Sequence, residues 1–387
     1  MAVNLFKNLF SRVGDTWKKD ESVVGIDIGS SFIKAVQIKK KEGRAVLETY
    51  GEIALGPYGN LEVGQATNLS PEKITEALKD LFKEAGITTK NAALSIPLKS
   101  SLLSVIKVPK LDSEKEINEM IPIEARKYIP VPISEITLDW WIVPKRESEK
   151  PGSEDAEVEK KEDDEEKLAE KKETMEVMVV AIHNETVSNY QDIIKKMELK
   201  NVFFELEIFS TIRSTFGHGM PEIMLMDIGA GSTKIAIVEY GVVRFSHIIS
   251  KGSQNISSAI SKSLSVSFSK AEDVKKELGV EAVEKSENTP NVVSLNLGNL
   301  FSEANTTLLE YQRKYGVSIG KVILTGGGAL LKGLSDIATQ NMDAEVVFGD
   351  SFGKVEAPVF LEPVLREAGP EFAVAVGLAL RKLQDAN

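Results

Sequence analysis

The sequence predicts an α/β protein made of two similar halves, each of which opens with the same three-strand meander. The stretch DIGSSFIK occupies residues 27–34, and DIGAGSTK occupies residues 227–234. In both stretches an Asp closes an apolar run, a Gly follows two positions later, and a Lys ends the pattern. A third glycine-rich stretch, TGGGALLKGL, begins at residue 325. This repetition predicts a fold duplicated around a cleft, to which each half contributes one polar hairpin.

Length and composition narrow the class of protein. A chain of 387 residues is too long for one ordinary domain core and predicts two or more domains. The lack of cysteine excludes disulfides, Cys-ligated metals and thiol chemistry, and fits an intracellular location. The net charge of −11 argues against a general nucleic-acid binder, which needs a basic footprint. The three histidines, at 183, 218 and 247, show no metal-ligand spacing.

The first half reads as an ordered series of strands and helices. Apolar runs bounded by turn residues predict strands over 23–29, 32–38, 45–55, 91–97, 102–109, 130–144, 175–182 and 201–208. Helical spacing predicts helices over 70–86, 113–129 and 184–199, and another that starts at 209. Ser70, Pro71 and Gly86 supply the N-cap, first-turn and C-cap signals of the 70–86 helix.

The second half repeats the meander and then departs from it. Strands are predicted over 222–229, 232–240, 242–250, 321–325 and 344–350. Serine-capped helices are predicted across 253–315, and two more follow the glycine turn, one reaching residue 340 and one over 369–384.

An acidic run interrupts the first half between two predicted strands. Residues 146–174 hold 13 acidic and 7 basic side chains, with few apolar ones. Because strands flank the run on both sides, we interpret it as a flexible, solvated hairpin loop inside a domain, not as a linker between domains.

The N-terminal segment, residues 1–20, lacks the apolar core and cleavage site of a signal peptide. Five apolar residues recur in it at helical spacing, namely Phe6, Leu9, Phe10, Val13 and Trp17. Two interpretations stay open: a short amphipathic helix resting on a membrane or a partner, or a loosely ordered extension. No apolar run in the chain is long enough to span a bilayer.

The two hairpins have the chemistry of a phosphate site. A tip of Gly and Ser turns several backbone N–H groups toward one point, where phosphate oxygens fit. The glycines allow close approach of the backbone, the hydroxyls add donors, and Lys34 supplies positive charge. The predicted binding residues are Gly29, Ser30, Ser31, Lys34, Gly229, Gly231, Ser232 and Thr233.

Two further features complete the predicted site. Asp27 and Asp227 end buried strands, and such carboxylates are costly unless they are paired or face a cation. Facing each other across a cleft, they suit Mg²⁺, which takes few protein ligands beside substrate phosphates. Gly326, Gly327 and Gly328 lie between a strand and a helix, where an adenosine or a phosphate can approach the backbone. The P-loop and Rossmann patterns are both absent.

These motifs resemble those of the actin-like ATPase superfamily. VVGIDIGSSFIK resembles its first phosphate loop, MLMDIGAGSTK its second, and VILTGGGALLKGL its adenosine motif. Within its FtsA/PilM branch the chain is similar to the PilM family of type IV pilus assembly proteins. The similarity includes SEKEINEMIPIEARKYIPVPISEITLDWWIV, MEVMVVAIHNETVSNYQDIIKKM and FELEIFSTIRST, and extends from about residue 21 to the C-terminus. Actin, chaperone and sugar-kinase relatives lack this middle segment.

The resemblance implies an actin-like (ribonuclease H-like) duplicated fold with four subdomains. They would be 1A at 21–60 and 183–220, 1C at 61–182, 2A at 221–252 and 320–387, and 2B at 253–319. It also implies ATP and Mg²⁺ in the cleft. The family pattern AExxK, matched by AEDVK, would place Glu272 and Lys275 near the ribose and adenine.

The resemblance also assigns a catalytic residue. Relatives position the attacking water with the Glu of an LEP motif, which matches Glu207 in LEIF. Ile208 replaces the Pro of the motif, and Glu205 is an alternative candidate.

The expected function is a cytoplasmic, nucleotide-gated scaffold at the inner membrane with at most slow ATPase activity. The family implies as partners the cytoplasmic tail of a PilN-like inner-membrane protein and other pilus assembly proteins, with membrane association through a partner or the N-terminal segment. One alternative is a turnover ATPase or sugar kinase, but no convincing catalytic base for a hydroxyl substrate is present. Another is an FtsA-like cell-division anchor, a family that carries its amphipathic helix at the C-terminus, whereas here the amphipathic segment is at the N-terminus.

Overall fold

The computed structural model describes residues 22–111, 113–144, 174–217, 220, 222–283 and 292–384. It divides into two compact units. Ser100–Val187 form the smaller unit, and the segments before and after it form the larger one, which contains both copies of the hairpin. The larger unit consists of two lobes, each built on a five-stranded sheet.

The first lobe contains the sheet of the first meander. Its strands are β1 (Ser22–Ile28), β2 (Phe32–Lys41), β3 (Arg44–Ala54), β4 (Asn91–Ile96) and β8 (Lys200–Leu206). They lie in the order β3-β2-β1-β4-β8, with β1, β2 and β3 antiparallel and β4 and β8 added in parallel. The lobe also contains the helices α1 (Pro71–Glu84), α3 (Asn184–Met197) and α4 (Glu207–Thr215).

The second lobe repeats that topology. Its strands are β9 (Glu222–Ile228), β10 (Thr233–Glu239), β11 (Val242–Ile249), β12 (Lys321–Thr325) and β13 (Glu345–Phe348), in the order β11-β10-β9-β12-β13. Its helices are α5 (Ser253–Leu264), α6 (Phe268–Leu278), α7 (Val292–Tyr315) and α8 (Leu334–Asn341). In both sheets the first strand of the meander pairs in parallel with a later strand. The predicted duplicated α/β fold is therefore confirmed.

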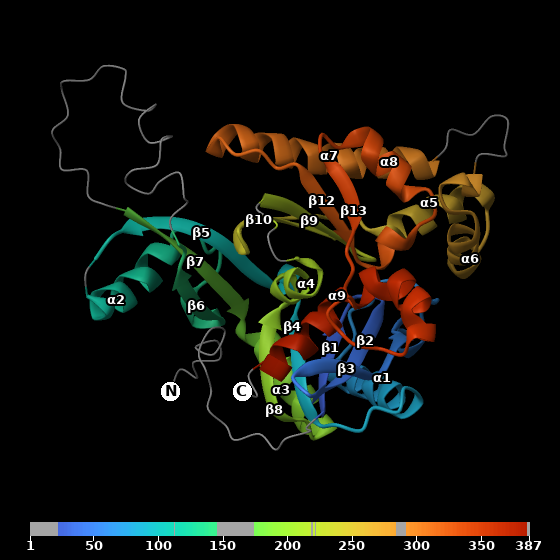
Figure 1. The fold of residues 1–387 in the computed structure, drawn as a ribbon, viewed down its shortest axis with the longest axis horizontal. Coiled ribbons are helices and arrows are strands. Elements are labelled where there is room, and N and C mark those ends of the chain that lie inside the picture. The colour runs from blue at the N-terminus through green and yellow to red at the C-terminus, as the bar shows by residue number, and fades with distance from the viewer. Residues whose placement is uncertain are drawn as a thin grey trace. The chain divides into compact units, whose positions relative to one another are not determined.

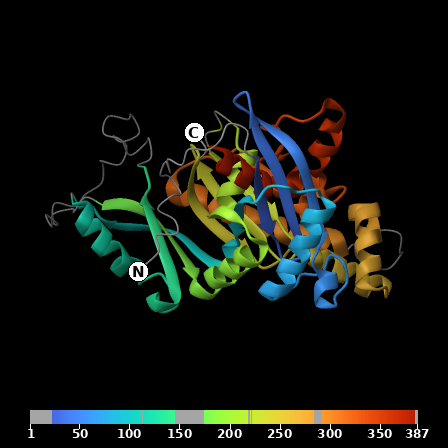
Figure 2. The ribbon, with the colours of Figure 1, turned by 90° about the horizontal axis from the view of Figure 1, so that it is seen from below.

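The last helix, α9 (Glu362–Gln384), belongs to the first lobe although it follows the second in sequence. Figure 1 and Figure 2 show it alongside β1 and β2, and its apolar residues share a core with those strands. The approach is close: a Cβ at Gly25 would lie 2.0 Å from the Ala375 carbonyl oxygen, and one at Gly377 would lie 1.8 Å from that of Ser210. Glycine on both sides lets α9 pack onto β1 and α4.

The smaller unit is a three-stranded antiparallel sheet with one helix. Its elements are β5 (Ser101–Pro109), α2 (Glu114–Ala125), β6 (Ile136–Ile142) and β7 (Thr174–His183). The strands lie in the order β5-β7-β6, and α2 buries Ile117 and Ile121 against one face. Because β6 and β7 are antiparallel neighbours, the acidic run between them connects the two strands of a hairpin.

Short 3₁₀ helices complete the described chain. They are Gly56–Gly59, Leu98–Ser100, Ile133–Glu135, Gly279–Val283, Gly327–Leu330 and Val359–Leu361.

Several boundaries differ from the sequence expectations. The α4 helix begins at Glu207 and α9 at Glu362, earlier than predicted, and α2 ends at Ala125, before the predicted 129. Pro370 lies inside α9, so it did not mark the start of that helix. Residues 61–99, which the resemblance places in subdomain 1C, lie in the larger compact unit. Their strand β4 pairs with β1 because its apolar residues complete the first sheet, so the compact inserted unit begins only at Ser100.

Two expectations fall on parts of the chain outside this description. They are the amphipathic segment over 1–20 and residues 146–173 of the acidic run. Within the residues that are described, no helix combines the length and apolar character needed to cross a bilayer.

Candidate functional site

The two repeated hairpins are built in the same way. The Gly29 N–H donates to the Phe32 carbonyl at 3.0 Å, and the Gly229 N–H donates to the Ser232 carbonyl at the same distance. In both hairpins the Asp lies directly across the strand pair from the Lys, so each pair shares one face of its sheet. The sequence repeat is therefore a structural repeat.

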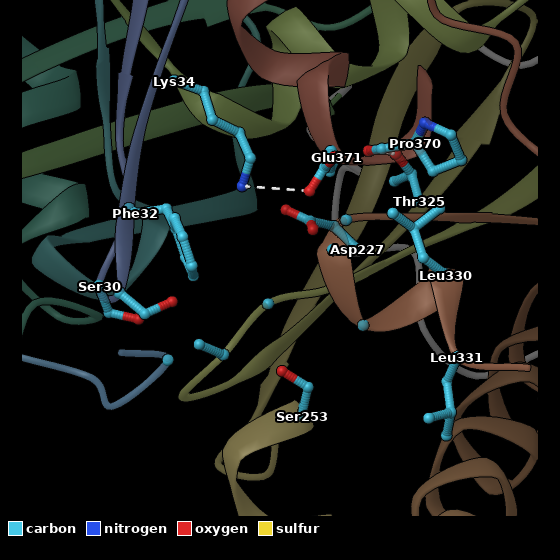
Figure 3. Close-up of a pocket in the computed structure, with 18 of the residues that line it drawn as sticks. Ser30, Phe32, Lys34, Asp227, Ser253, Thr325, Leu330, Leu331, Pro370 and Glu371 are labelled. Atoms are coloured by element: carbon cyan, nitrogen blue, oxygen red, sulfur yellow. Dashed lines mark hydrogen bonds and ion pairs between the residues drawn. The ribbon is translucent and has the colours of Figure 1, made fainter. Parts of the chain in front are cut away.

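Both hairpins line a single cavity of about 390 Å³ between the lobes, shown in Figure 3. This volume lies within the range of small-molecule sites. The predicted site residues that line it are Asp27, Gly29, Ser30, Ser31, Lys34, Glu207, Asp227, Gly229, Gly231, Ser232, Glu272, Lys275, Gly326, Gly327 and Gly328. Thr233 is the exception: it is fully buried, and its hydroxyl donates to the Lys251 carbonyl at 2.9 Å. The β10 alternation turns Thr233 to the face opposite the cavity.

The triple-glycine turn packs directly against the second hairpin. Gly326 has φ of +84°, and a Cβ there would lie 2.3 Å from Asp227 Oδ1. A Cβ at Gly328 would lie 2.4 Å from a methyl group of Ile228. The Gly326 N–H donates to the Pro370 carbonyl at 2.8 Å, which fixes the turn beside α9. Only glycine fits this backbone conformation and spacing.

A polar cluster on α5 and α6 forms the far wall of the cavity. Lys275 Nζ lies 2.7 Å from Glu272 Oε1 and 2.8 Å from Ser257 Oγ. The Ser257 hydroxyl also donates to the Glu272 carboxylate. Burial lowers the pKa of Lys275, and the Glu272 carboxylate opposes that shift. The two residues that the resemblance assigned to ribose and adenine are therefore held together before any ligand binds.

A loop of the first lobe reaches across to this cluster. The Ser269 N–H donates to Glu62 Oε2 at 2.7 Å, and the Ala66 N–H donates to Gln254 Oε1 at 3.1 Å. Between these contacts Gly64, with φ of +89°, lies so close to Glu272 that a Cβ would be 2.8 Å from its side chain. Sequence analysis did not identify this loop, because contacts between lobes leave no local pattern.

The two repeated lysines have different partners. Lys34 extends toward Glu371 of α9, as Figure 3 shows, at 3.9 Å, and lies 3.6 Å from Glu52 on the neighbouring strand. Burial raises the pKa of Glu371, with Lys34 opposing the shift. Lys34 thus lies at the cavity wall between two carboxylates.

Lys234 instead bridges the two lobes. Its Nζ lies 3.0 Å from Glu207 Oε2, on the first lobe, and 3.1 Å from Asp227 Oδ2, on the second. Burial alone would lower the pKa of Lys234, but the carboxylates around it outweigh burial and raise the pKa above its ordinary value. The ammonium therefore stays charged.

The structure separates the two candidate glutamates. Glu205 is 1% exposed and makes a two-pronged pair with the Arg213 guanidinium, at 2.6 Å for each contact, so its role is in packing. Glu207 lines the cavity, where its Oε1 accepts the Leu98 N–H at 2.7 Å. Burial, with repulsion from Asp227 and Asp27, raises the pKa of Glu207. Of the two, only Glu207 faces the cavity.

Asp27 is the carboxylate best placed for a divalent cation. The Ser95 hydroxyl donates to its Oδ1 at 2.8 Å, and burial raises its pKa. Among the described residues no group of three or more acidic or histidine side chains is arranged to hold a metal. A divalent cation here would take most of its ligands from phosphate oxygens and water, with Asp27 lining the cavity and Asp227 paired with Lys234.

Sequence reasoning also missed Lys234 and Glu371, which line the cavity, and Ser95 and Tyr190, which interact with its carboxylates. Burial and the Asp27 and Glu207 carboxylates raise the pKa of Tyr190, so it stays a neutral phenol behind them. The Lys234 signal was available, since it occupies the same repeat position as Lys34. Ser95 and Tyr190 lie in ordinary strand and helix patterns, which do not single them out.

The fold and site define an actin-like protein, with two duplicated lobes around a cavity lined by paired hairpins. A family model described as type IV pilus assembly protein PilM matches residues 25–159 and 164–383. The chain belongs to that family.

Two solved structures are similar over nearly the whole chain. One, described as the PilM-PilN type IV pilus biogenesis complex, is 26% identical with a TM-score of 0.73, and the match covers 93% of this chain and 98% of that one. The other, the ethanolamine utilization protein EutJ from Carboxydothermus hydrogenoformans, is 14% identical with a TM-score of 0.51 over 95% and 91% of the chains. The second likeness concerns the fold alone.

Curated relatives match over shorter stretches. The cell division protein FtsA of Bacillus subtilis is 29% identical over 175 residues, which is 40% of this chain and 37% of FtsA. FtsA of Neisseria meningitidis serogroup B is 24% identical over 226 residues, covering 52% and 53%. This chain thus spans about half or less of the curated relatives it matches.

Proposed function

We propose that this protein binds ATP in the cavity between its lobes and serves as a nucleotide-dependent scaffold in type IV pilus assembly. The observation that carries the proposal is the convergence of two matching hairpins and a triple-glycine turn on one cavity. Hairpin tips of this kind present backbone N–H groups to phosphate oxygens, and the glycine turn admits a nucleoside against the backbone. The family membership supports the assembly role.

The residues take distinct roles in this proposal. The phosphates lie between the tips at Ser30 and Gly231, with Lys34 supplying positive charge. The nucleoside lies along Gly327 toward Glu272 and Lys275, which are already paired with each other. A ribose hydroxyl could bond to the Glu272 carboxylate without an ordering cost for that side chain.

Mg²⁺ would enter with the phosphates, held on the protein side by Asp27, and would neutralise phosphate charge, while Asp227 is already paired with Lys234. Glu207 is the proposed water-positioning residue. Its carboxylate is already paired with Lys234, which weakens it as an acceptor for the attacking water. Hydrolysis is therefore expected to be slow, and the bound nucleotide to act as a structural switch between lobe arrangements.

The proposed partner is the cytoplasmic tail of a PilN-like inner-membrane protein. A structure described as the PilM-PilN complex matches 93% of this chain and 98% of its own at 26% identity, which supports a PilN-like partner. Such a tail would hold this protein at the cytoplasmic face of the inner membrane. An FtsA-like role is less well supported, because the FtsA matches cover 40% and 52% of this chain, whereas the PilM model extends from residue 25 to 383.

Calorimetry of ATP binding tests the nucleotide site. We expect ATP to bind to the wild-type protein, and Gly231→Trp to abolish binding because the indole would fill the tip of the second hairpin. The matched control is Gly320→Trp, at an exposed position before β12 with open space around it, which should bind ATP as the wild type does. Absence of ATP binding to the folded wild-type protein would overturn the proposal.

A further inference from the structure

We infer that Lys234 is a tethered cation of the second hairpin, placed where a divalent cation would otherwise bridge Asp227 and Glu207. The inference rests on the proposed nucleotide site, and it specifies how that site is neutralised. It gives the two hairpins different electrostatic roles: one receives a soluble cation with the nucleotide, and the other carries its own.

The contacts of Lys234 are those of a bridging ion. Its Nζ lies 3.0 Å from Glu207 Oε2 and 3.1 Å from Asp227 Oδ2. The lysine side chain is 15% exposed and each carboxylate side chain is 8% exposed, so water screens these charges little. Glu207 begins α4 in the first lobe and Asp227 lies on β9 in the second, so one ammonium joins the two lobes.

The first hairpin shows the alternative arrangement at the equivalent position. Lys34 stands across from Asp27 in the strand register, as Lys234 does from Asp227. Its ammonium turns away to Glu52 and Glu371 at the cavity wall. Asp27 accepts a hydrogen bond from the neutral Ser95 hydroxyl, and the nearby charges of Lys234 and Lys34 oppose the burial that raises its pKa. Among the described residues no lysine makes with Asp27 the close ion pair that Lys234 makes with Asp227. Identical local sequence patterns therefore create one metal-accessible carboxylate and one that is already neutralised.

The two kinds of cation exclude each other at the second hairpin. Mg²⁺ requires about six oxygen ligands at roughly 2.0–2.1 Å, and a lysine ammonium in contact with the same oxygens leaves no room for that shell. Two buried carboxylates without a counter-charge would be strongly destabilising. Lys234 removes that cost in every nucleotide state, because it is covalently attached.

The consequence is that the second hairpin adds little to the Mg²⁺ dependence of nucleotide binding, because Asp227 and Glu207 are already neutralised by Lys234. Replacing Lys234 by an uncharged residue frees Asp227 and Glu207 for the metal. The test compares the ATP dissociation constant in EDTA with that in Mg²⁺, by calorimetry, for the wild type, Lys234→Gln and Lys234→Arg. We expect the ratio of the dissociation constant in EDTA to that in Mg²⁺ to rise about tenfold in Lys234→Gln, because changes to the partners of metal ligands typically have effects of this size. In Lys234→Arg the ratio should stay near the wild-type value.

Lys34→Gln is the matched control from the repeated hairpin. It should weaken ATP binding by a similar factor with and without Mg²⁺, because Lys34 holds neither Asp27 nor Asp227. A wild-type ratio in Lys234→Gln would overturn the inference. So would an equal loss of affinity in both conditions, since Lys234 would then be a direct phosphate ligand.

A double variant and a melting experiment provide the test if Lys234→Gln alone folds poorly. The double variant Glu207→Gln/Lys234→Gln removes both charges of the pair and still frees Asp227. Its ratio of dissociation constants in EDTA and Mg²⁺ should therefore be raised. A wild-type ratio in the double variant would also contradict the inference. Without nucleotide, added Mg²⁺ should raise the melting temperature of Lys234→Gln but not of the wild type, and equal shifts would count against the tethered cation. Failure of the wild type to bind ATP would overturn the proposed function, while the melting experiment would still decide the role of Lys234.

Discussion

The carboxylate of Glu62 accepts the backbone N–H of Ser269 at 2.7 Å, and the two residues come from opposite lobes. Ser269 lies in the first turn of α6, where an acidic side chain is favourable because the helix leaves free N–H groups there. The contact holds Gly64 over Glu272 at the edge of the cavity. The contact between the lobes therefore lies next to the part of the cavity in which we propose that the nucleoside binds.

Removing this contact should loosen the cavity. Glu62→Ala is expected to speed release of a fluorescent ATP analogue about fivefold, because the lost helix-end bond contributes about 1 kcal/mol. Stopped-flow displacement measures the release rate. Glu84→Ala, at an exposed position on α1 in the same lobe, is the control and should release the analogue at the wild-type rate. Identical rates in both variants would show that the loop does not restrain the nucleotide.

The triple-glycine turn should not tolerate a side chain at its first position. Gly326→Ala combines a left-handed backbone with a Cβ 2.3 Å from Asp227 Oδ1, so the turn must shift. We expect a destabilisation of about 1–3 kcal/mol and loss of ATP binding, measured by thermal melting and calorimetry. Gly320→Ala is the control, because Gly320 lies before β12 with open space around it, and this variant should behave as the wild type. Normal ATP affinity in Gly326→Ala would remove the turn from the site.

Substitutions of Glu205 and Glu207 should have different effects, one on stability and the other on ATP hydrolysis. Glu205→Gln breaks a buried pair with Arg213 and should lower the free energy of unfolding by about 3–5 kcal/mol. Glu207→Gln should lower the residual hydrolysis rate at least about tenfold, because the proposed acceptor for the water is lost. Denaturant unfolding and phosphate release per folded molecule give the two numbers. The opposite pattern, with hydrolysis lost only in Glu205→Gln, would reverse the assignment.

Glu371 should make stability depend on pH. Its pKa is raised by burial, so the folded protein holds this proton to a higher pH than the unfolded chain does. Its contribution to stability is complete below the ordinary pKa of 4.5 and is lost as pH rises through the raised value. Melting temperatures from pH 4 to 8 should therefore fall more in the wild type than in Glu371→Gln. Parallel curves would mean that Glu371 ionises as freely in the folded protein as in the unfolded chain.

The sequence predicted the duplicated fold because its signals were local. The two DIG hairpins, the meanders that follow them and the glycine turn each lie within a few residues of one another, and the structure shows them as expected. The cavity-lining residues on these turns could be named in advance for the same reason. Thr233 was the exception, because the alternation of β10 turns its side chain away from the cavity, where its hydroxyl donates to the Lys251 carbonyl.

The features that could not be predicted from the sequence depend on contacts between segments that are distant along the chain. The pairing of β4 with β1, which moves residues 61–99 into the first lobe, follows from shared apolar surface and not from a boundary signal. Lys234 carries the same pattern as Lys34, yet its partner Glu207 comes from the other lobe. Glu62 likewise acquires its role from a contact between the lobes, and Glu371 and Ser95 acquire theirs from segments of the first lobe that are distant in sequence.

A nucleotide-dependent scaffold requires that ATP binding and partner binding be coupled, and a peptide titration measures that coupling. A fluorescent peptide with the sequence of the cytoplasmic tail of the cognate PilN-like protein is titrated with this protein, with and without saturating ATP and Mg²⁺, and its anisotropy is recorded. Because two sites can be coupled only through states that both ligands distinguish, we expect specific binding with an affinity that changes about fivefold between the two conditions. A scrambled peptide should not bind in either. Equal affinity with and without ATP, or no binding of the tail peptide, would contradict a nucleotide-dependent scaffold.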